Sequence, residues 1–279
     1  MELHVAFASI MVHVDFEEEA EERIGVAAAL AARFNAHLIG VAGWPLRKSG
    51  VLERSDVEYP PLEQALQAKI LEQLDKLGEN FRRSAGANPR GVEWRASHHF
   101  PNEVIAAEAR AADLIVIGKE ALPGDVYHTF DPGAVILASG RPVLAVPRGI
   151  GSLEASHILI AWKDTREARR AVCDALPFLK KAQAVTIAAI GAQEFEPALR
   201  EQVSDVASYL EHHRVIVGHQ IVVSAGETGG KRLLRVAEQQ NADLIVAGAY
   251  GRSRLSEWIF GGVTRDLLRT SKVACLFSN

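Results

Sequence analysis

Ala112-Asp113-Leu114-Ile115-Val116 recurs as Ala242-Asp243-Leu244-Ile245-Val246, and each copy is followed by two residues of which the second is glycine. The two copies lie 130 positions apart. A second pair of related stretches, residues 11–15 and 159–163, lies 148 positions apart, and each stretch opens one half of the chain. Two repeated landmarks in the same order predict a duplicated unit. The offset drops from 148 at the first landmark along the chain to 130 at the second, which predicts about 18 extra residues in the first half. The proline-containing stretch 44–62 is the natural place for them, because loops tolerate insertions.

Short apolar runs alternate with segments of helical periodicity in both halves. Apolar strands imply burial on both faces, so the pattern predicts a parallel sheet flanked by helices in each half. The expected strands are 9–14, 37–41, 93–96, 114–117, 142–146, 158–162, 185–190, 220–223, 244–247 and 273–277. The expected helices are 18–34, 62–84, 102–111, 134–139, 166–179, 197–213, 231–241 and 263–269. A glycine-rich linker at 148–152 predicts two domains, residues 1–148 and 156–279.

The composition excludes several classes of protein. The 279 residues carry a net charge of −4, which argues against a nucleic-acid binder with a basic face. No apolar run is long enough to cross a membrane, and residues 1–4 do not resemble a secretory signal. Cys173 and Cys275 have no metal or redox spacing, and neighbouring histidines do not converge on one ion. We therefore expect a cytosolic protein without a metal site.

The segment after residues 244–247 has the composition of a phosphate site. Parallel sheets bind ligands beyond the carboxyl ends of their strands, and helix N-termini favour phosphate. Glycines allow close backbone approach, while arginine and hydroxyl groups add donors. The residues concerned are Gly248, Gly251, Arg252, Ser253, Gly261, Gly262, Val263 and Thr264. The alternative is a glycine-rich turn that serves packing alone.

With these motifs the sequence resembles the universal stress protein family in its tandem, two-domain form. The family's nucleotide-binding members carry Gly, two residues, Gly, nine residues, Gly and then Ser or Thr. Gly248, Gly251 and Gly261 fit that spacing, and Gly262 stands at the Ser/Thr position. The resemblance implies a Rossmann-like α/β fold, with a five-stranded parallel sheet of order 3-2-1-4-5 in each half. It also implies that the halves face each other across their last strands.

Neither half carries the family's complete nucleotide set. Asp15 stands where nucleotide-binding members hold an aspartate at the end of the first strand, but the loop after Gly118 lacks the later glycines. The second half keeps the glycines and has Lys163 in place of that aspartate. The resemblance implies that ATP or a related adenine nucleotide, with Mg²⁺ as a companion ion, binds the second half rather than the first. Its base-side residues there would be Ala161, Trp162, Lys163 and Asp164.

Two hypotheses for Lys163 remain open at this point: a contact to ligand, or a surface residue that pairs with Asp164 or Glu167 or points to water. The sequence offers no credible acid–base pair or nucleophile, so we expect a non-catalytic, nucleotide-binding stress-response module that acts through a ligand-dependent surface for a protein partner. The alternatives are an interaction protein that binds no nucleotide, and a slow ATPase. The chain is expected to be a monomer containing an internal pseudo-dimer, or a homodimer.

Overall fold

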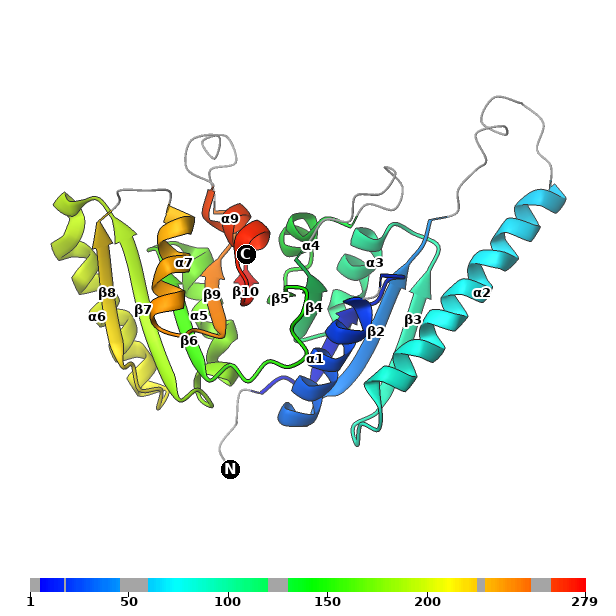
Figure 1. Ribbon diagram of the computed structural model, residues 1–279, viewed down its shortest axis with the longest axis horizontal. Coiled ribbons are helices and arrows are strands. Elements are labelled where there is room, and N and C mark those ends of the chain that lie inside the picture. The colour runs from blue at the N-terminus through cyan, green and yellow to red at the C-terminus, as the bar shows by residue number, and fades with distance from the viewer. Residues whose placement is uncertain (1–5, 18, 46–59, 120–129, 225–228, 252–261) are drawn as a thin grey trace, which may run out of the picture.

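The computed structural model describes residues 6–17, 19–45, 60–119, 130–224, 229–251 and 262–279. The strands of this part of the chain form one ten-stranded sheet of order β3-β2-β1-β4-β5-β10-β9-β6-β7-β8 (Figure 1). Their bounds are β1 Ser9–His13, β2 His37–Gly43, β3 Val92–Ser97, β4 Leu114–Gly118, β5 Val143–Val146, β6 His157–Trp162, β7 Ala184–Gly191, β8 His219–Ser224, β9 Leu244–Gly248 and β10 Ala274–Ser278.

The sheet consists of two units with the same internal order. We call the part that contains β1–β5 the first unit and the part that contains β6–β10 the second unit. Strands are parallel within each unit, and the predicted order 3-2-1-4-5 is confirmed in both. The units join where β5 and β10 pair antiparallel, with Leu144 opposite Leu276. The expectation that the halves meet across their last strands is therefore also confirmed.

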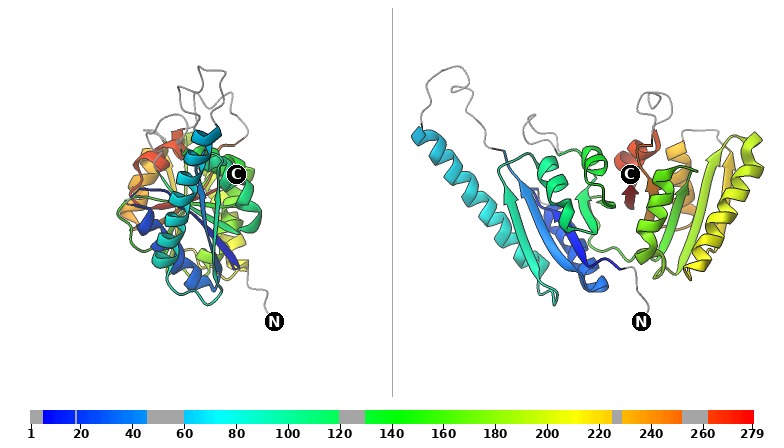
Figure 2. Two further views of the ribbon diagram at one scale, coloured as in Figure 1. Left: turned by 90° about the vertical axis from the view of Figure 1, so that its right-hand side faces the viewer. Right: turned by 180° about the vertical axis from the view of Figure 1, so that it is seen from behind.

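Helices cover both faces of the sheet (Figures 1 and 2). One buried cluster joins the sheet to α1, α2, α5 and α6, and the other joins it to α3, α4, α7 and α9. Their bounds are α1 Glu19–Phe34, α2 Pro60–Ala85, α3 Pro101–Glu108, α4 Pro132–Ala138, α5 Arg166–Leu179, α6 Glu196–His212, α7 Gly229–Gln239 and α9 Gly262–Thr270. Short 3₁₀ turns occupy Ala109–Ala111 and Gln193–Phe195. The elements lie where the pattern predicts them, and no helix of the described residues is long and apolar enough to span a bilayer.

The aspartate of the repeated pentapeptide has a structural role. Asp113 accepts hydrogen bonds from the backbone N–H groups of Ala8 and Ser9, at 2.8 and 3.0 Å. Asp243 accepts the equivalent bonds from Ser156 and His157, at 2.8 and 2.9 Å. Each carboxylate therefore satisfies two backbone donors where the first strand of its unit begins, which fixes that strand beside the fourth. These equivalent hydrogen bonds explain why the aspartate occurs in both copies.

The linker is more firmly attached than its glycine content suggests. Gly149 donates its N–H to Glu22 at 2.8 Å, and Arg148 forms an ion pair with Glu19 at 2.9 Å. Beyond the exposed Gly151, Leu153 and Ala155 are buried in the core cluster that contains α1 and α5. The exposed part of the linker is consequently limited to a few residues.

Candidate functional site

Each unit has a candidate site at the carboxyl ends of its first and fourth strands, where the strand order reverses. In the second unit these strands are β6 and β9, and α9 begins at the same edge because it runs back to the start of β10. The predicted residues found at these strand ends or at the start of α9 are Ala161, Trp162, Lys163, Asp164, Gly248, Gly251, Gly262, Val263 and Thr264. Arg252, Ser253 and Gly261 lie outside the described residues.

Lys163 has no side-chain partner among the described residues. Its side chain is exposed directly after β6. Asp164 pairs with Arg169, and Glu167 pairs with Arg166 at 2.5 Å, so neither carboxylate that could neutralise Lys163 does so. The Lys163 ammonium is therefore available to an anion that approaches the ends of β6 and β9.

Two buried polar atoms at this edge also lack partners in the described part of the chain. They are Nε1 of Trp162, which ends β6, and Oγ of Ser278, which ends β10. Trp162 is 8% exposed and Ser278 is 1% exposed. The two strands flank β9 on either side, with Ser278 in register with Gly248. A buried donor without an acceptor costs about 1–3 kcal/mol, which a ligand atom can recover.

The three described glycines of this site have different surroundings. A Cβ atom on Gly248 would lie 2.4 Å from the backbone nitrogen of Ala168, so this glycine allows β9 to approach the start of α5. A Cβ on Gly251 would meet only the Glu167 carboxylate, at 3.3 Å. A Cβ on Gly262 would have Asp266 as its nearest neighbour, at an ordinary 3.5 Å. Packing therefore requires glycine at position 248 and not at 262.

Glu167 places a buried negative charge beside Gly251. It lies in the first turn of α5, which Thr165 caps by accepting the N–H of Ala168 at 3.3 Å. Burial raises the pKa of the Glu167 carboxyl, but hydrogen bonds from Arg166, from its own backbone and from Thr165 outweigh that effect and leave the pKa below its ordinary value. The carboxylate is therefore ionised at neutral pH, and a phosphate at Gly251 needs a compensating cation.

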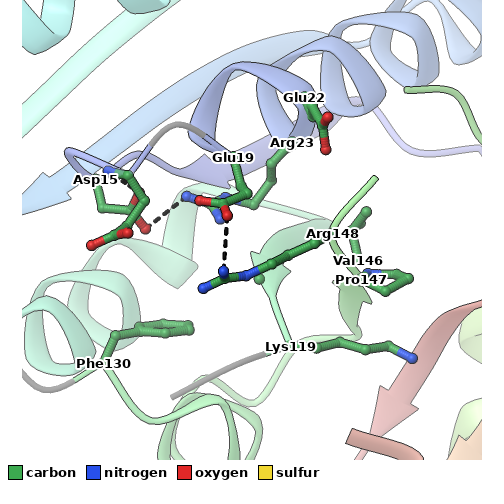
Figure 3. A pocket seen from close by; sticks show the side chains of 11 residues that line it. Asp15, Glu19, Glu22, Arg23, Lys119, Phe130, Val146, Pro147 and Arg148 are labelled. Atoms are coloured by element: carbon green, nitrogen blue, oxygen red, sulfur yellow. Dashed lines mark hydrogen bonds and ion pairs between the residues drawn. The ribbon is translucent and has the colours of Figure 1, made fainter. Parts of the chain in front are cut away.

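Arg23 fills the corresponding site of the first unit (Figure 3). Its guanidinium donates to Asp15 at 2.7 Å and to the carbonyl oxygen of His13 at 2.8 Å, and the side chain is buried. A Cβ on Gly118 would lie 2.9 Å from the same guanidinium. Both predicted first-half site residues, Asp15 and Gly118, therefore accommodate an internal arginine.

An open pocket remains beside Arg23, but its charged groups are largely paired with one another (Figure 3). Besides the Asp15–Arg23 pair, Arg148 lies 2.9 Å from Glu19, and Glu22 accepts the backbone N–H of Gly149. The lining residues are Asp15, Glu17, Glu19, Glu22, Arg23, Gly118, Lys119, Phe130, Val146, Pro147 and Arg148. Four carboxylates in this lining disfavour phosphate.

The helix start that would hold phosphate in the first unit is capped by its own chain. Asp131 precedes α4 and accepts the N–H of Gly133 at 2.8 Å. Arg23 and Asp131 were not among the predicted site residues. Arg23 aligns with Ala171 of the second half, but the sequence difference alone does not reveal the ion pair that Arg23 forms.

Within the described ranges, no three histidine, cysteine, aspartate or glutamate side chains come together in a way that could hold a metal ion.

Comparison with known proteins identifies relatives for both units. The model of the universal stress protein family matches residues 6–125 and 154–278. A universal stress protein from Archaeoglobus fulgidus DSM 4304 is 17% identical, covers 98% of this chain and 96% of its own, and superposes with a TM-score of 0.69. A functionally unknown protein from Pseudomonas aeruginosa PAO1 is 17% identical over 98% of this chain and 92% of its own, with a TM-score of 0.54.

A universal stress protein solved in complex with cAMP is 19% identical over 50% of this chain and 96% of its own, with a TM-score of 0.34. At 17% identity, the two structures from Archaeoglobus fulgidus and Pseudomonas aeruginosa show the fold alone. No curated protein matches the chain.

Proposed function

Since the chain belongs to the universal stress protein family as a tandem of two family domains, we propose that its second domain binds one adenine nucleotide and that its first domain binds none. The domains are taken as residues 1–148 and 156–279. ATP is the preferred candidate, with Mg²⁺ as its companion ion. The proposed role is that of a non-catalytic module of the stress response that works inside the cell.

The proposal rests on one difference between the two units: the charged group at the end of the first strand is paired in the first unit and, among the described residues, unpaired in the second. Ile10 opposes Leu114 and Ile158 opposes Leu244, so the units share one register. In the first unit, the carboxylate at the end of the first strand is neutralised by Arg23. In the second unit Lys163 replaces that carboxylate, and the buried Ala171 replaces Arg23. Within the described part of the chain, the second unit therefore has an uncompensated cation where the first has an internal ion pair.

Different groups of the second unit would bind different parts of a nucleotide. Backbone N–H groups at Gly262, Val263 and Thr264 open α9 and suit phosphate, since they lie at the positive end of the helix dipole. The same proposal assigns Arg252 and Ser253 to the phosphates. Trp162 Nε1 and Lys163 lie on the β6 side, where they would meet a phosphate or a polar edge of the base. Mg²⁺ on the phosphates would offset the charge of Glu167.

Bound nucleotide would act by fixing the glycine loop, Gly248–Gly251, and would thereby change the surface offered to a protein partner. The chain's own residues supply binding and orientation in this scheme, and no nucleophile or general base is assigned. An interaction protein without nucleotide and a slow ATPase are the competing outcomes of the tests.

Lys163 provides the sharpest test of the proposed site. A charge-assisted contact to ligand is worth roughly 1.5–3 kcal/mol, so Lys163→Ala should weaken ATP binding about 10–150-fold. Calorimetric titration with MgATP measures this loss, and Lys180→Ala, on another exposed lysine, is the matched control. A loss below about threefold, or no binding by the unmodified protein, would refute the proposal. Release of phosphate from bound ATP above the buffer background would support the slow ATPase instead.

A further inference from the structure

A lysine of the first unit ends inside the second unit. Lys119 follows β4, and its side chain is buried, with 5% of its surface exposed. Its Nζ lies 2.5 Å from the carbonyl oxygen of Val273, 3.2 Å from that of Ser271 and 3.4 Å from that of Leu267. The sulfur of Cys275 lies 3.2 Å from the same nitrogen. One ammonium group thus contacts the last turn of α9 and the chain that leads from it into β10.

This contact suits the end of a helix. The last carbonyl groups of a helix have no partners within it, and the helix dipole is negative there. Lysine side chains commonly satisfy such carbonyls. Lys119 does so from another unit, while its equivalent in the second unit is Ala249. The arrangement is therefore one-sided: the first unit holds α9 of the second, and no matching lysine holds α4.

A second contact runs in the opposite direction, from the glycine loop of the second unit to the first. Tyr250 lies between Gly248, which ends β9, and Gly251, and has a left-handed backbone with φ of +51°. A Cβ on Gly133 would lie 2.5 Å from the Tyr250 hydroxyl oxygen, so the tyrosine reaches the first turn of α4. The backbone beside it is fixed by Asn279, whose side-chain amide donates to the carbonyl oxygen of Ala249 at 2.8 Å.

The two contacts secure the two parts of the proposed nucleotide site. The backbone of Tyr250 belongs to the loop Gly248–Gly251, and α9 carries the helix start at Gly262. A tyrosine with left-handed backbone is strained and persists where surrounding contacts hold it. Figure 1 shows α4 and α9 facing each other near the centre of the molecule, one from each unit.

We infer that the first domain is a positioning element for the nucleotide site of the second, with Lys119 fixing α9 and the start of α4 fixing Tyr250. The ligand part of this inference rests on the proposed function, whereas the positioning part does not. Lys119 and Gly133 are positioning residues, since they act through α9 and Tyr250 without touching the ligand. On this account a tandem chain retains a domain that binds no nucleotide because its neighbour's site is incomplete without it.

Hydrogen–deuterium exchange on the full chain without ligand tests the positioning directly. Lys119→Met removes the charged donor at similar length, and amide exchange in residues 262–270 should speed up roughly tenfold or more. Gly133→Ala should displace the Tyr250 hydroxyl and speed up exchange in residues 244–251, with little harm to folding because one side-chain end has to move. Gly25→Ala is the matched control, since nothing lies within 4 Å of its Cβ position. Unchanged exchange in both variants would overturn the inference, and Gly133→Ala alone decides if Lys119→Met does not fold.

MgATP titration of the same variants separates the two proposals. If the unmodified protein binds ATP, Lys119→Met and Gly133→Ala should each weaken binding by at least about threefold, and equal affinities would contradict the positioning role. If the unmodified protein binds no ATP, the proposed function fails, and the exchange rates by themselves decide whether the first domain positions α9.

Discussion

Single residues decide which of two similar sites is open. Arg23 closes the first site because its guanidinium occupies the space that Gly118 leaves and pairs with Asp15. The sequence could predict Asp15 and Lys163 as opposite residues at the same strand end. It could not predict the Arg23 contact, because an arginine in a charged helix has the pattern of a solvated residue and its burial depends on tertiary packing. The sequence also could not predict that Lys163 is unpaired among the described residues. Its two neighbouring carboxylates, Asp164 and Glu167, pair with arginines instead.

His13 makes the stability of the first unit sensitive to acid. Its ring is buried, stacks on Phe130 at 4.5 Å, and has its Nδ1 3.6 Å from Asp15. Burial lowers the pKa of His13 to about 4, although the charge of Asp15 opposes that effect. In the unfolded chain the group protonates near pH 6.5, so the unfolded state binds more protons below that pH and stability falls from pH 6.5 towards 4.

Urea unfolding at pH 7.5 and pH 5 measures this effect. The free energy of unfolding should drop by about 2 kcal/mol through His13 alone. His13→Gln should lose that part of the pH dependence, while His212→Gln, on an exposed histidine, should keep it. Equal pH dependence in the unmodified protein and His13→Gln would show that His13 is not buried in its neutral form.

At the scale of elements, one loop and one helix start form the proposed site, and their glycines are not equivalent. The spacing of Gly248, Gly251 and Gly261 predicts a phosphate loop, but sequence does not separate glycines needed for packing from glycines that leave room for ligand. The structure separates them by what a side chain would touch: the backbone of α5 at Gly248 and only the end of a side chain at Gly262. Element positions were predictable from periodicity, whereas this distinction depends on how β9 packs against α5.

Substitution at these two glycines should therefore have opposite results. Gly248→Ala forces a methyl group against backbone atoms of Ala168 and should lower the free energy of unfolding by roughly 1–3 kcal/mol. Gly262→Ser meets no obstacle and should leave stability within about 1 kcal/mol. Urea unfolding of both variants checks the difference. Similar losses for the two would contradict the packing role assigned to Gly248.

At the scale of the whole molecule, the two domains form one continuous sheet. β5 pairs with β10, and Phe7, Phe34 and Phe178 pack together across the units with ring centroids 5.1–5.3 Å apart. The duplication was predictable from the two repeated landmarks, and the meeting of the last strands followed from family resemblance. The attachment of the linker was not predictable, since its composition is that of an exposed segment, while Leu153 and Ala155 are buried.

Cleavage of the linker should consequently leave the domains together. Limited proteolysis should cut within residues 148–152, and the two fragments should still elute as one species in gel filtration. The β5–β10 pairing and the aromatic cluster hold them without the covalent connection. Separation of the fragments under native conditions would show that the linker, and not the interface, joins the domains.

Native mass spectrometry with MgATP counts bound nucleotides directly and therefore tests whether one of the two related sites binds nucleotide. We expect one ATP per chain at saturation. Gly251→Val should abolish that binding because its branched side chain fills the loop, and Gly118→Ala should retain one ATP per chain because Arg23 already fills the first site. Two ATP per chain, or a single ATP that survives Gly251→Val and is lost in Gly118→Ala, would contradict the account.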